Sequence, residues 1–397
     1  MNSSSSPAII PNSFRWGTLA VGILAAILAV VGLLTSGASQ FFPSYLFAFM
    51  FWVGLSGGCL VLVMMYFVAG GKWARMIQGI TSAGARTMWL LLILFIPIPF
   101  GLKYLYPWAQ PERVAANEVL QHQSGYLNPT FFVIRAVIFI AIWIVLAIII
   151  TRQAVLDDAL TNRTRFYRLR TLSTIGLILY FLTMSFASVD WILSLQEGWY
   201  SSIFGLIVIL SQGLISLSFA ILILRLLLWP RYLEAHAGTE DQQTNRDLGA
   251  ILLAFTMGWA YLSFFQFLII WAGNISHEVA WYAIRLNNGW QVLALIMVIA
   301  QFALPFFALI SMQTRSKLNI LAGISALVFL VNLVTLFWQV APSIYPNGVH
   351  VHWLDFILPI AMGGLWLFFF SSQLKALPAI PTLPKPVVGE PAQEAHP

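Results

Sequence analysis

The sequence predicts an all-α polytopic membrane protein with about ten transmembrane helices, and two observations carry this prediction. The 397-residue chain is 60% hydrophobic and only 9% charged, whereas soluble domains are roughly one-quarter charged. Its apolar residues gather into ten stretches, each close to the roughly 20 residues that a helix needs to cross a hydrocarbon core about 30 Å thick. Because lipid offers no hydrogen bonds to the backbone, such stretches are expected to be helices.

The first five predicted spans are 16–35, 44–69, 87–104, 130–150 and 170–193. The first follows a polar, Ser-rich segment and has the length of a membrane span, not of a signal-peptide core. The third contains Pro97, Pro99 and Gly101, which should kink or break its helix. The fourth carries Arg135 near one end, and the fifth carries Asp190.

The last five predicted spans are 201–228, 248–272, 287–312, 317–340 and 353–372. The first four of these hold one deep amide each, at Gln212, Gln266, Gln301 and Asn332, and the last has a carboxylate, Asp355, at its edge. Amides join helices in membranes as readily as they line a path. The spans make one domain over 16–374, between an N-terminal tail, 1–15, and a Pro-rich, extended tail, 375–397.

The basic residues predict the orientation of the chain. Of the 20 Lys and Arg residues, 16 fall on the side that holds both termini, which the positive-inside rule makes cytoplasmic. These are Arg15, Lys72, Arg75, Arg86, Arg152, Arg163, Arg165, Arg168, Arg170, Arg225, Arg231, Arg246, Arg315, Lys317, Lys375 and Lys385. The opposite side has Lys103, Arg113 and Arg285. The net charge of +6 therefore sets orientation and requires no nucleic-acid partner, although the 163–170 cluster could also touch anionic lipid.

The sequence offers few ligands for a redox centre or metal. Its one cysteine, Cys59, lies in the second span, so the chain cannot ligate an iron–sulfur cluster. The six histidines lie outside the predicted spans, where they cannot serve as axial ligands of a transmembrane haem; they are His122, His236, His277, His350, His352 and His396. We therefore expect no bound metal, no redox cofactor and no catalytic residue of the chain's own.

Ionisable side chains at membrane depth are the candidate functional residues, because they are costly unless paired or hydrated. Asp190, Asp355, Arg135 and Lys103 all fall near the same side of the membrane. They could border a hydrated cavity that exchanges protons or a quinone head group, with Asp190 favoured because Thr183, Ser185 and Ser188 precede it on its helix. Alternatively, Arg135 and an aspartate form a structural ion pair, Lys103 extends to the head groups, and each hydroxyl bonds a carbonyl one turn back.

A series of short motifs resembles one family in succession and covers the chain from about Tyr45 to Leu374. These motifs are SYLFAF (44–49), GKW (71–73), ART (85–87), KYLYPW (103–108), YLN (126–128), FASVDW (186–191), IFG (203–205), WAY (259–261), FQFLIIW (265–271), GN (273–274) and HWLD (352–355). They are similar to the second NrfD-like integral membrane subunit, called ActF, of bacterial alternative complex III.

The resemblance implies two four-helix bundles plus two flanking helices, in the bacterial cytoplasmic membrane. It implies a quinol:electron-acceptor oxidoreductase whose c-type haems and iron–sulfur clusters lie in partner subunits, beside a sister NrfD-like subunit. Quinol or quinone could contact the chain, which would support assembly and proton translocation. The matched motifs mark Asp190, Asp355, Arg135, Lys103 and Gln266 as proton-path or polar-cavity residues, and Ser188 and Thr183 join them from the hydroxyl pattern.

Two other classes of function remain open. The chain could be a purely structural scaffold of the same complex. It could also be a stand-alone secondary transporter, whose mark would be discontinuous helices at matching positions of two halves. The sequence shows one such break, between Pro97 and Gly101.

Overall fold

The computed structural model describes residues 10–154, 163–228 and 242–375. Most of the two predicted tails lies outside these ranges, as do Arg231, Lys385, His236 and His396. Within the described ranges the chain is helical and has no strand, and ten of its helices are long and apolar enough to cross a membrane. The predicted all-α class is therefore confirmed, and so is the predicted number of helices long and apolar enough to cross a membrane.

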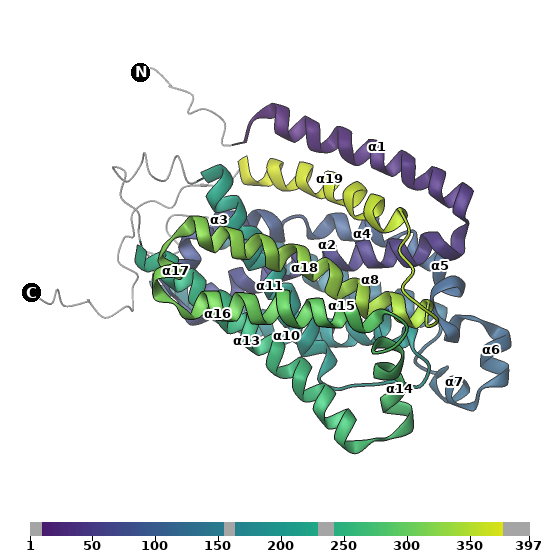
Figure 1. Ribbon diagram of the computed structural model, residues 1–397. Helices are drawn as coiled ribbons and strands as arrows, with labels where there is room; N and C mark the ends of the chain where they lie inside the picture. The colour runs from purple at the N-terminus through teal and green to yellow at the C-terminus, as the bar shows by residue number, and fades with distance from the viewer. Residues whose placement is uncertain (1–9, 155–162, 229–241, 376–397) are drawn as a thin grey trace, which may run out of the picture.

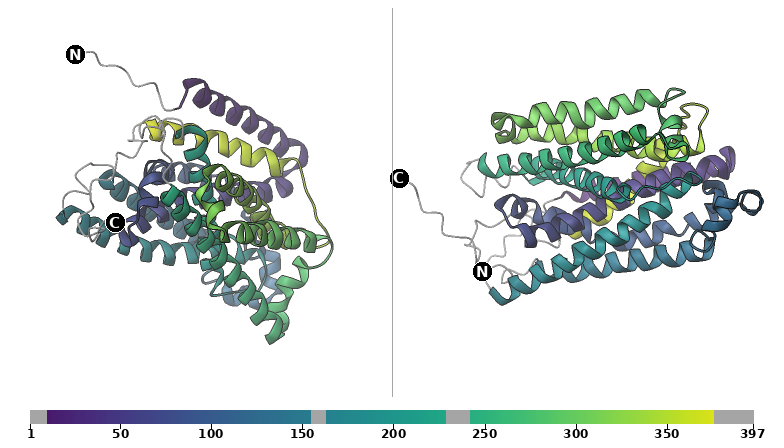
Figure 2. Two further views of the ribbon diagram at one scale, coloured as in Figure 1. Left: turned by 60° about the vertical axis from the view of Figure 1, so that its left-hand side comes forward. Right: turned by 90° about the horizontal axis from the view of Figure 1, so that it is seen from below.

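The long helices lie side by side with their axes roughly aligned (Figures 1 and 2). Short helices lie at both ends of the bundle. The elements are α1 (Asn12–Ser36), α2 (Ala38–Ala69), α3 (Lys72–Ala85), α4 (Met88–Phe95), α5 (Ile98–Leu105), η1 (Pro107–Ala109), α6 (Pro111–Ala116), α7 (Glu118–Gln123), α8 (Pro129–Ala154), α10 (Arg163–Trp191), η2 (Leu193–Leu195), α11 (Phe204–Ile223), η3 (Leu224–Leu228), α13 (Gln242–Gly273), α14 (Ser276–Arg285), α15 (Trp290–Met297), η4 (Val298–Ala303), α16 (Leu304–Ile310), α17 (Met312–Ser316), α18 (Leu318–Ile344) and α19 (Leu354–Lys375).

The third crossing differs from its predicted bounds. Its helical path already begins at Lys72, because Gly70 and Gly71 adopt positive φ angles of 74° and 107° and turn the chain directly from α2 into α3. The path then continues through α4 and α5, which are separated where Pro97 lacks a backbone N–H. The predicted break near Pro97 is thus confirmed, whereas the predicted start at residue 87 was too late.

α2 is the central helix of the bundle. Its membrane-spanning stretch is completely buried, and it packs against α3, α5, α10, α11 and α19. Gly58 permits the close approach of α11, since a Cβ there would lie 2.1 Å from the Gln212 carbonyl oxygen. Ser216 Oγ of α11 also donates to the Leu55 carbonyl at 2.9 Å. Small residues let the two backbones approach, which is how helices associate tightly where both partners are apolar.

α1 packs along α19 at one edge of the bundle, where the two helices lie side by side (Figure 1). A Cβ on Gly364 would lie 2.4 Å from the Gly22 Cα, so the two backbones meet at these glycines. The outer face of α1 is exposed and apolar, for example at Leu34 and Leu24. Such a face suits lipid or the helices of a partner subunit.

The two ends of the bundle carry different elements. The start of α3 and α17 lie at one end, and α6, α7 and α14 lie at the other (Figure 1). Lys72 and Arg315 are therefore at the end opposite to Arg113 and Arg285, in agreement with the predicted alternation of loops. Which end faces the cytoplasm, and the division into two four-helix bundles, stay predictions.

Candidate functional site

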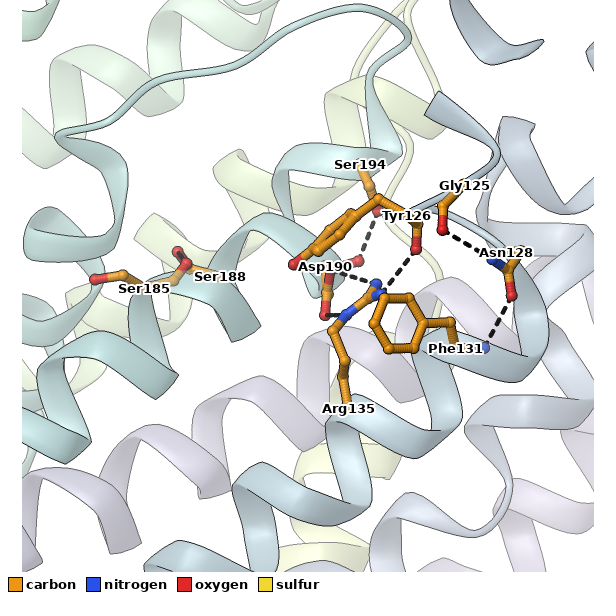
Figure 3. Close-up of polar contacts among 9 residues, drawn as sticks. All are labelled: Gly125, Tyr126, Asn128, Phe131, Arg135, Ser185, Ser188, Asp190 and Ser194. Atoms are coloured by element: carbon orange, nitrogen blue, oxygen red, sulfur yellow. Dashed lines mark hydrogen bonds and ion pairs between the residues drawn. The ribbon is translucent and has the colours of Figure 1, made fainter. Parts of the chain in front are cut away.

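Arg135 of α8 and Asp190 of α10 form a buried ion pair (Figure 3). Arg135 Nε donates to Asp190 Oδ2 at 2.8 Å, and Nη2 donates to Oδ1 at 2.9 Å. The third nitrogen, Nη1, donates to the Tyr126 carbonyl at 2.7 Å. Arg135 is 6% exposed and Asp190 is 1% exposed. Both oxygens and all three guanidinium nitrogens are thus occupied, as a buried charge pair requires.

The loop before α8 encloses this pair. Asn128 caps the helix by accepting a hydrogen bond from the Phe131 N–H at 2.9 Å, and Pro129 follows at a position where no N–H is needed. The cap directs the Tyr126 and Phe131 rings against the guanidinium, whose Cζ lies 3.7 Å and 4.4 Å from their centroids. Burial, followed by the Asp190 charge, raises the pKa of Tyr126 to about 12, so its hydroxyl stays protonated at neutral pH.

The hydroxyls that precede Asp190 bond to their own helix. Thr183 Oγ1, Ser185 Oγ and Ser188 Oγ donate to the carbonyls of Leu179, Phe181 and Ser185 respectively, at 2.7 Å each. Ser185 and Ser188 lie away from the carboxylate (Figure 3). Within the described part of the chain, these hydroxyls therefore form no hydrogen-bonded chain to Asp190. The geometry favours the ion-pair interpretation, and a proton path through Asp190 stays a prediction.

Asp355 belongs to a second polar cluster, at the N-terminus of α19. Its Oδ1 accepts from Ser44 Oγ of α2 at 2.5 Å, and its Oδ2 accepts from the His352 N–H at 2.8 Å. A carboxylate in the first turn of a helix also interacts favourably with the helix dipole. Gln40 extends the cluster, because its Nε2 donates to Ser44 Oγ at 3.2 Å.

Two side chains from the loop before α19 complete this cluster on Gln40. Tyr345 Oη donates to Gln40 Oε1 at 2.9 Å, and His350 Nε2 lies 3.0 Å from the same oxygen. Burial, followed by the Asp355 charge, raises the pKa of Tyr345 to about 12, which keeps it a donor. His350 is exposed. We name Gln40, Ser44, Tyr345, His350 and Asp355 the Asp355 cluster; it links a solvent-exposed imidazole to a half-buried carboxylate.

The remaining predicted residues, Lys103 and Gln266, lie apart from both clusters. Lys103 is exposed, and its Nζ lies 4.9 Å from the Tyr104 ring centroid. Gln266 of α13 is buried; its Oε1 accepts from Ser201 Oγ at 2.9 Å and its Nε2 donates to Tyr282 Oη at 3.1 Å. The structure thus joins Arg135 with Asp190, and separates the other predicted residues.

Gln266 lines a cavity of about 590 Å³ between α11, α13, α14, α15, η4 and α18. Its walls are mainly aromatic and aliphatic, and the lining contains no charged side chain. The sequence does not predict this cavity, because its walls come from residues up to 135 positions apart, from Phe204 to Gln339. The lining includes Phe264, Gln266, Trp281, Tyr282, Ala294 and Gln339.

Arg285 lies behind one wall of this cavity and was predicted as an ordinary loop cation. It is fully buried at the end of α14, where it donates to the carbonyls of Trp281 and Gln339 and to Ser343 Oγ. No carboxylate lies within ion-pairing distance of it among residues 10–154, 163–228 and 242–375. Burial lowers the pKa of Arg285 from its ordinary value.

Neither similarity to known proteins nor a group of metal ligands assigns a role to this site. The chain matches no protein-family profile, and no curated protein is significantly similar to it. Over the described ranges, no three His, Cys, Asp or Glu side chains are grouped so that they could hold a metal ion. Arg135 and Asp190 can hold two helices together. The Asp355 cluster can exchange protons, and the cavity can bind an apolar molecule.

Proposed function

We propose that this protein is a membrane subunit of a quinol:electron-acceptor oxidoreductase in a bacterial cytoplasmic membrane. In this proposal it carries no redox centre itself, and it supports assembly and proton translocation. Its partners are a sister NrfD-like subunit, an iron–sulfur subunit and c-type cytochrome subunits, with lipid around them. The motif series supports the family, and the ten apolar helices support a place inside a membrane complex.

The Asp355 cluster is the observation that carries the proton-handling role. It places a carboxylate, a hydroxyl, an amide, a phenol and an imidazole in continuous hydrogen-bonded contact at one end of the bundle. An imidazole nitrogen can donate or accept a hydrogen bond according to its tautomer, and His350 is the exposed member of the cluster. Asp355 would receive a proton at this end, while Gln40 and Ser44 hold the cluster together between α2 and α19.

The Arg135–Asp190 pair supports the assembly role. Both carboxylate oxygens accept from the guanidinium, and all three guanidinium nitrogens donate, so the pair joins α8 to α10 at a fixed register. If no variant of the Asp355 cluster alters proton movement, the purely structural scaffold becomes the better description.

A stand-alone secondary transporter is the second candidate, and one observation favours it. In a ten-span chain divided into two halves of five, the third and eighth spans occupy matching positions. The third is broken between α4 and α5, and the eighth contains the π-helix η4 followed by Pro305. Paired interruptions of this kind mark transporters built from repeats.

Purification of the tagged chain from its native membrane in mild detergent separates these functions. The proposal expects c-type haem absorbance and iron–sulfur signals to co-purify with the chain, together with quinol-oxidising activity. A monodisperse chain that purifies alone, without haem, would contradict the proposal and favour the transporter.

Reconstituted complexes then test the proton role of Asp355. We expect Asp355→Asn to assemble and oxidise quinol while moving fewer protons per electron, because an amide cannot titrate. Asp355→Glu is the matched control, since it keeps a titratable carboxylate, and it should retain most of the proton movement. Unchanged proton stoichiometry in an assembled Asp355→Asn complex would remove this cluster from the path.

A further inference from the structure

We propose that the cavity beside Gln266 is a binding site for an isoprenoid quinone or quinol, whose ring oxygens are recognised by Gln339 and Tyr282. The choice of a quinone as the ring compound rests on the proposed function. The presence of a site for a flat, polar-edged ring with an apolar tail rests on the cavity itself.

The size and lining of the cavity suit such a molecule. Its volume of about 590 Å³ lies within the roughly 300–1,000 Å³ of small-molecule sites. Trp281 and Phe204 line its inner end and offer a ligand ring apolar contact; the Trp281 ring itself already stacks on Trp199, with the two centroids 4.6 Å apart. Phe264 and Tyr261 also line it and are more than half exposed on the outer surface of α13, so a membrane-dissolved ligand could enter from the lipid.

Gln339 supplies the first polar contact. Its side chain is only 4% exposed, lines the cavity, and makes no hydrogen bond to any residue that the structure describes. Because Gln339 lines the cavity, its amide is open to a ligand, and a ligand oxygen would provide its hydrogen-bond partner. Because an amide both donates and accepts, Gln339 can bind a carbonyl or a hydroxyl, the two states of a quinone oxygen.

Tyr282 supplies the second contact. Gln266 Nε2 donates to the Tyr282 oxygen at 3.1 Å, and Gln266 is itself held by Ser201. This arrangement leaves the Tyr282 hydroxyl hydrogen to donate to a ligand. Burial raises the pKa of Tyr282 to about 12, so the hydroxyl remains a donor at neutral pH. Gln266, the residue marked by its motif, thus acts as a positioning residue.

Arg285 distinguishes a quinone from a phospholipid. Its guanidinium Cζ lies 3.8 Å from the centroid of the Trp281 ring and its Nη2 donates to the Gln339 carbonyl at 2.7 Å, so its charge stands directly behind the wall. The lining offers a phosphate no cationic side chain. A quinone ring is neutral and gains negative charge at its oxygens when it is reduced. The Arg285 charge behind the wall would stabilise that negative charge.

The backbone beside the cavity has an uncommon conformation. The π-helix η4 contributes Val298 and Phe302 to the lining, while its Gln301 faces the other way and accepts from Thr335 Oγ1. π-Helical turns widen a helix locally and are frequent at functional sites. The widened turn therefore helps to form the space.

Quinone binding to the purified full chain in lipid nanodiscs tests this site. A decyl-substituted benzoquinone is titrated while tryptophan fluorescence is followed, because Trp281 and Trp338 line the cavity. We expect saturable quenching, weakened about 3- to 10-fold by Gln339→Leu and by Tyr282→Phe, as expected for one hydrogen bond each. Ala294→Trp should abolish it by filling the space. The matched control, Gln313→Leu on the exposed α17, should leave binding unchanged.

The outcomes are separable from those of the proposed function. Quenching that Ala294→Trp removes but neither polar substitution weakens would overturn ring recognition and leave a lipid-tail cavity. Should Gln339→Leu fail to fold, Tyr282→Phe, which keeps the ring, decides alone. A chain that binds quinone here but purifies without haem subunits would refute the proposed function and keep the site. An active complex whose chain does not bind quinone here would refute the site alone.

Discussion

Neutralising Asp190 should destabilise the protein because Arg135 would remain buried without its counterion. In Asp190→Asn, the amide oxygen can accept one of the two charge-assisted hydrogen bonds of 2.8 and 2.9 Å, and the other is lost. The guanidinium keeps its bond to the Tyr126 carbonyl and its contact with two aromatic rings.

The expected magnitude follows from these contacts. Removing one member of a buried pair costs about 3–5 kcal/mol. The retained bond and the ring contacts, worth about 0.5–2 kcal/mol, place Asp190→Asn at the lower end, about 3 kcal/mol. This is a large part of a total stability of about 5–15 kcal/mol. Arg135→Gln with Asp190→Asn should cost less than the sum of the single changes, because the double variant contains no buried charge.

Denaturant titration of the purified chain in mixed micelles measures these free energies of unfolding. Asp247→Asn, a carboxylate change on the less buried start of α13, is the control and should stay within about 0.5 kcal/mol. Additive single changes, or an Asp190→Asn variant as stable as the parent, would refute the ion-pair account. A stable, assembled Asp190→Asn complex that moves fewer protons per electron would instead restore Asp190 to the proton path.

Three further predictions concern other parts of the molecule. The pKa of Tyr126 is raised to about 12 in the folded protein, from about 10 in the unfolded chain. Its contribution to stability is therefore complete below pH 10 and declines towards pH 12. Absorbance titration of Tyr126→Phe against the parent should show one phenol fewer near pH 12. Single cysteines at Thr164 and Asn347 in a Cys59→Ala background should be labelled from opposite sides of intact membranes, and labelling of both from outside would contradict the topology. Gly364→Leu should separate α1 from α19, since even a Cβ there lies 2.4 Å from the Gly22 Cα; protease release of α1 measures this, and an unchanged cleavage pattern would oppose it.

The sequence by itself determined the class of the protein and the existence of its spans. Every backbone group in lipid must be bonded within its own helix, so apolar length alone locates ten helices. The break at Pro97 was also predictable, because proline lacks an N–H wherever it lies. The start of the third helical path at Lys72 was not predictable, because α3 is buried by packing against α2, which the sequence does not show.

The tertiary structure alone decided which side chains meet. From the sequence, Arg135 could pair with either membrane-level aspartate, and the packing of α8 on α10 places Asp190 beside it. The packing of α2 on α19 brings Asp355 within hydrogen-bonding distance of Ser44, 311 positions away. Neither the cavity nor the burial of Arg285 was predictable from the sequence. The physical reason is that membrane helices are apolar on every face, so sequence periodicity does not indicate their neighbours, and only the packed bundle fixes them.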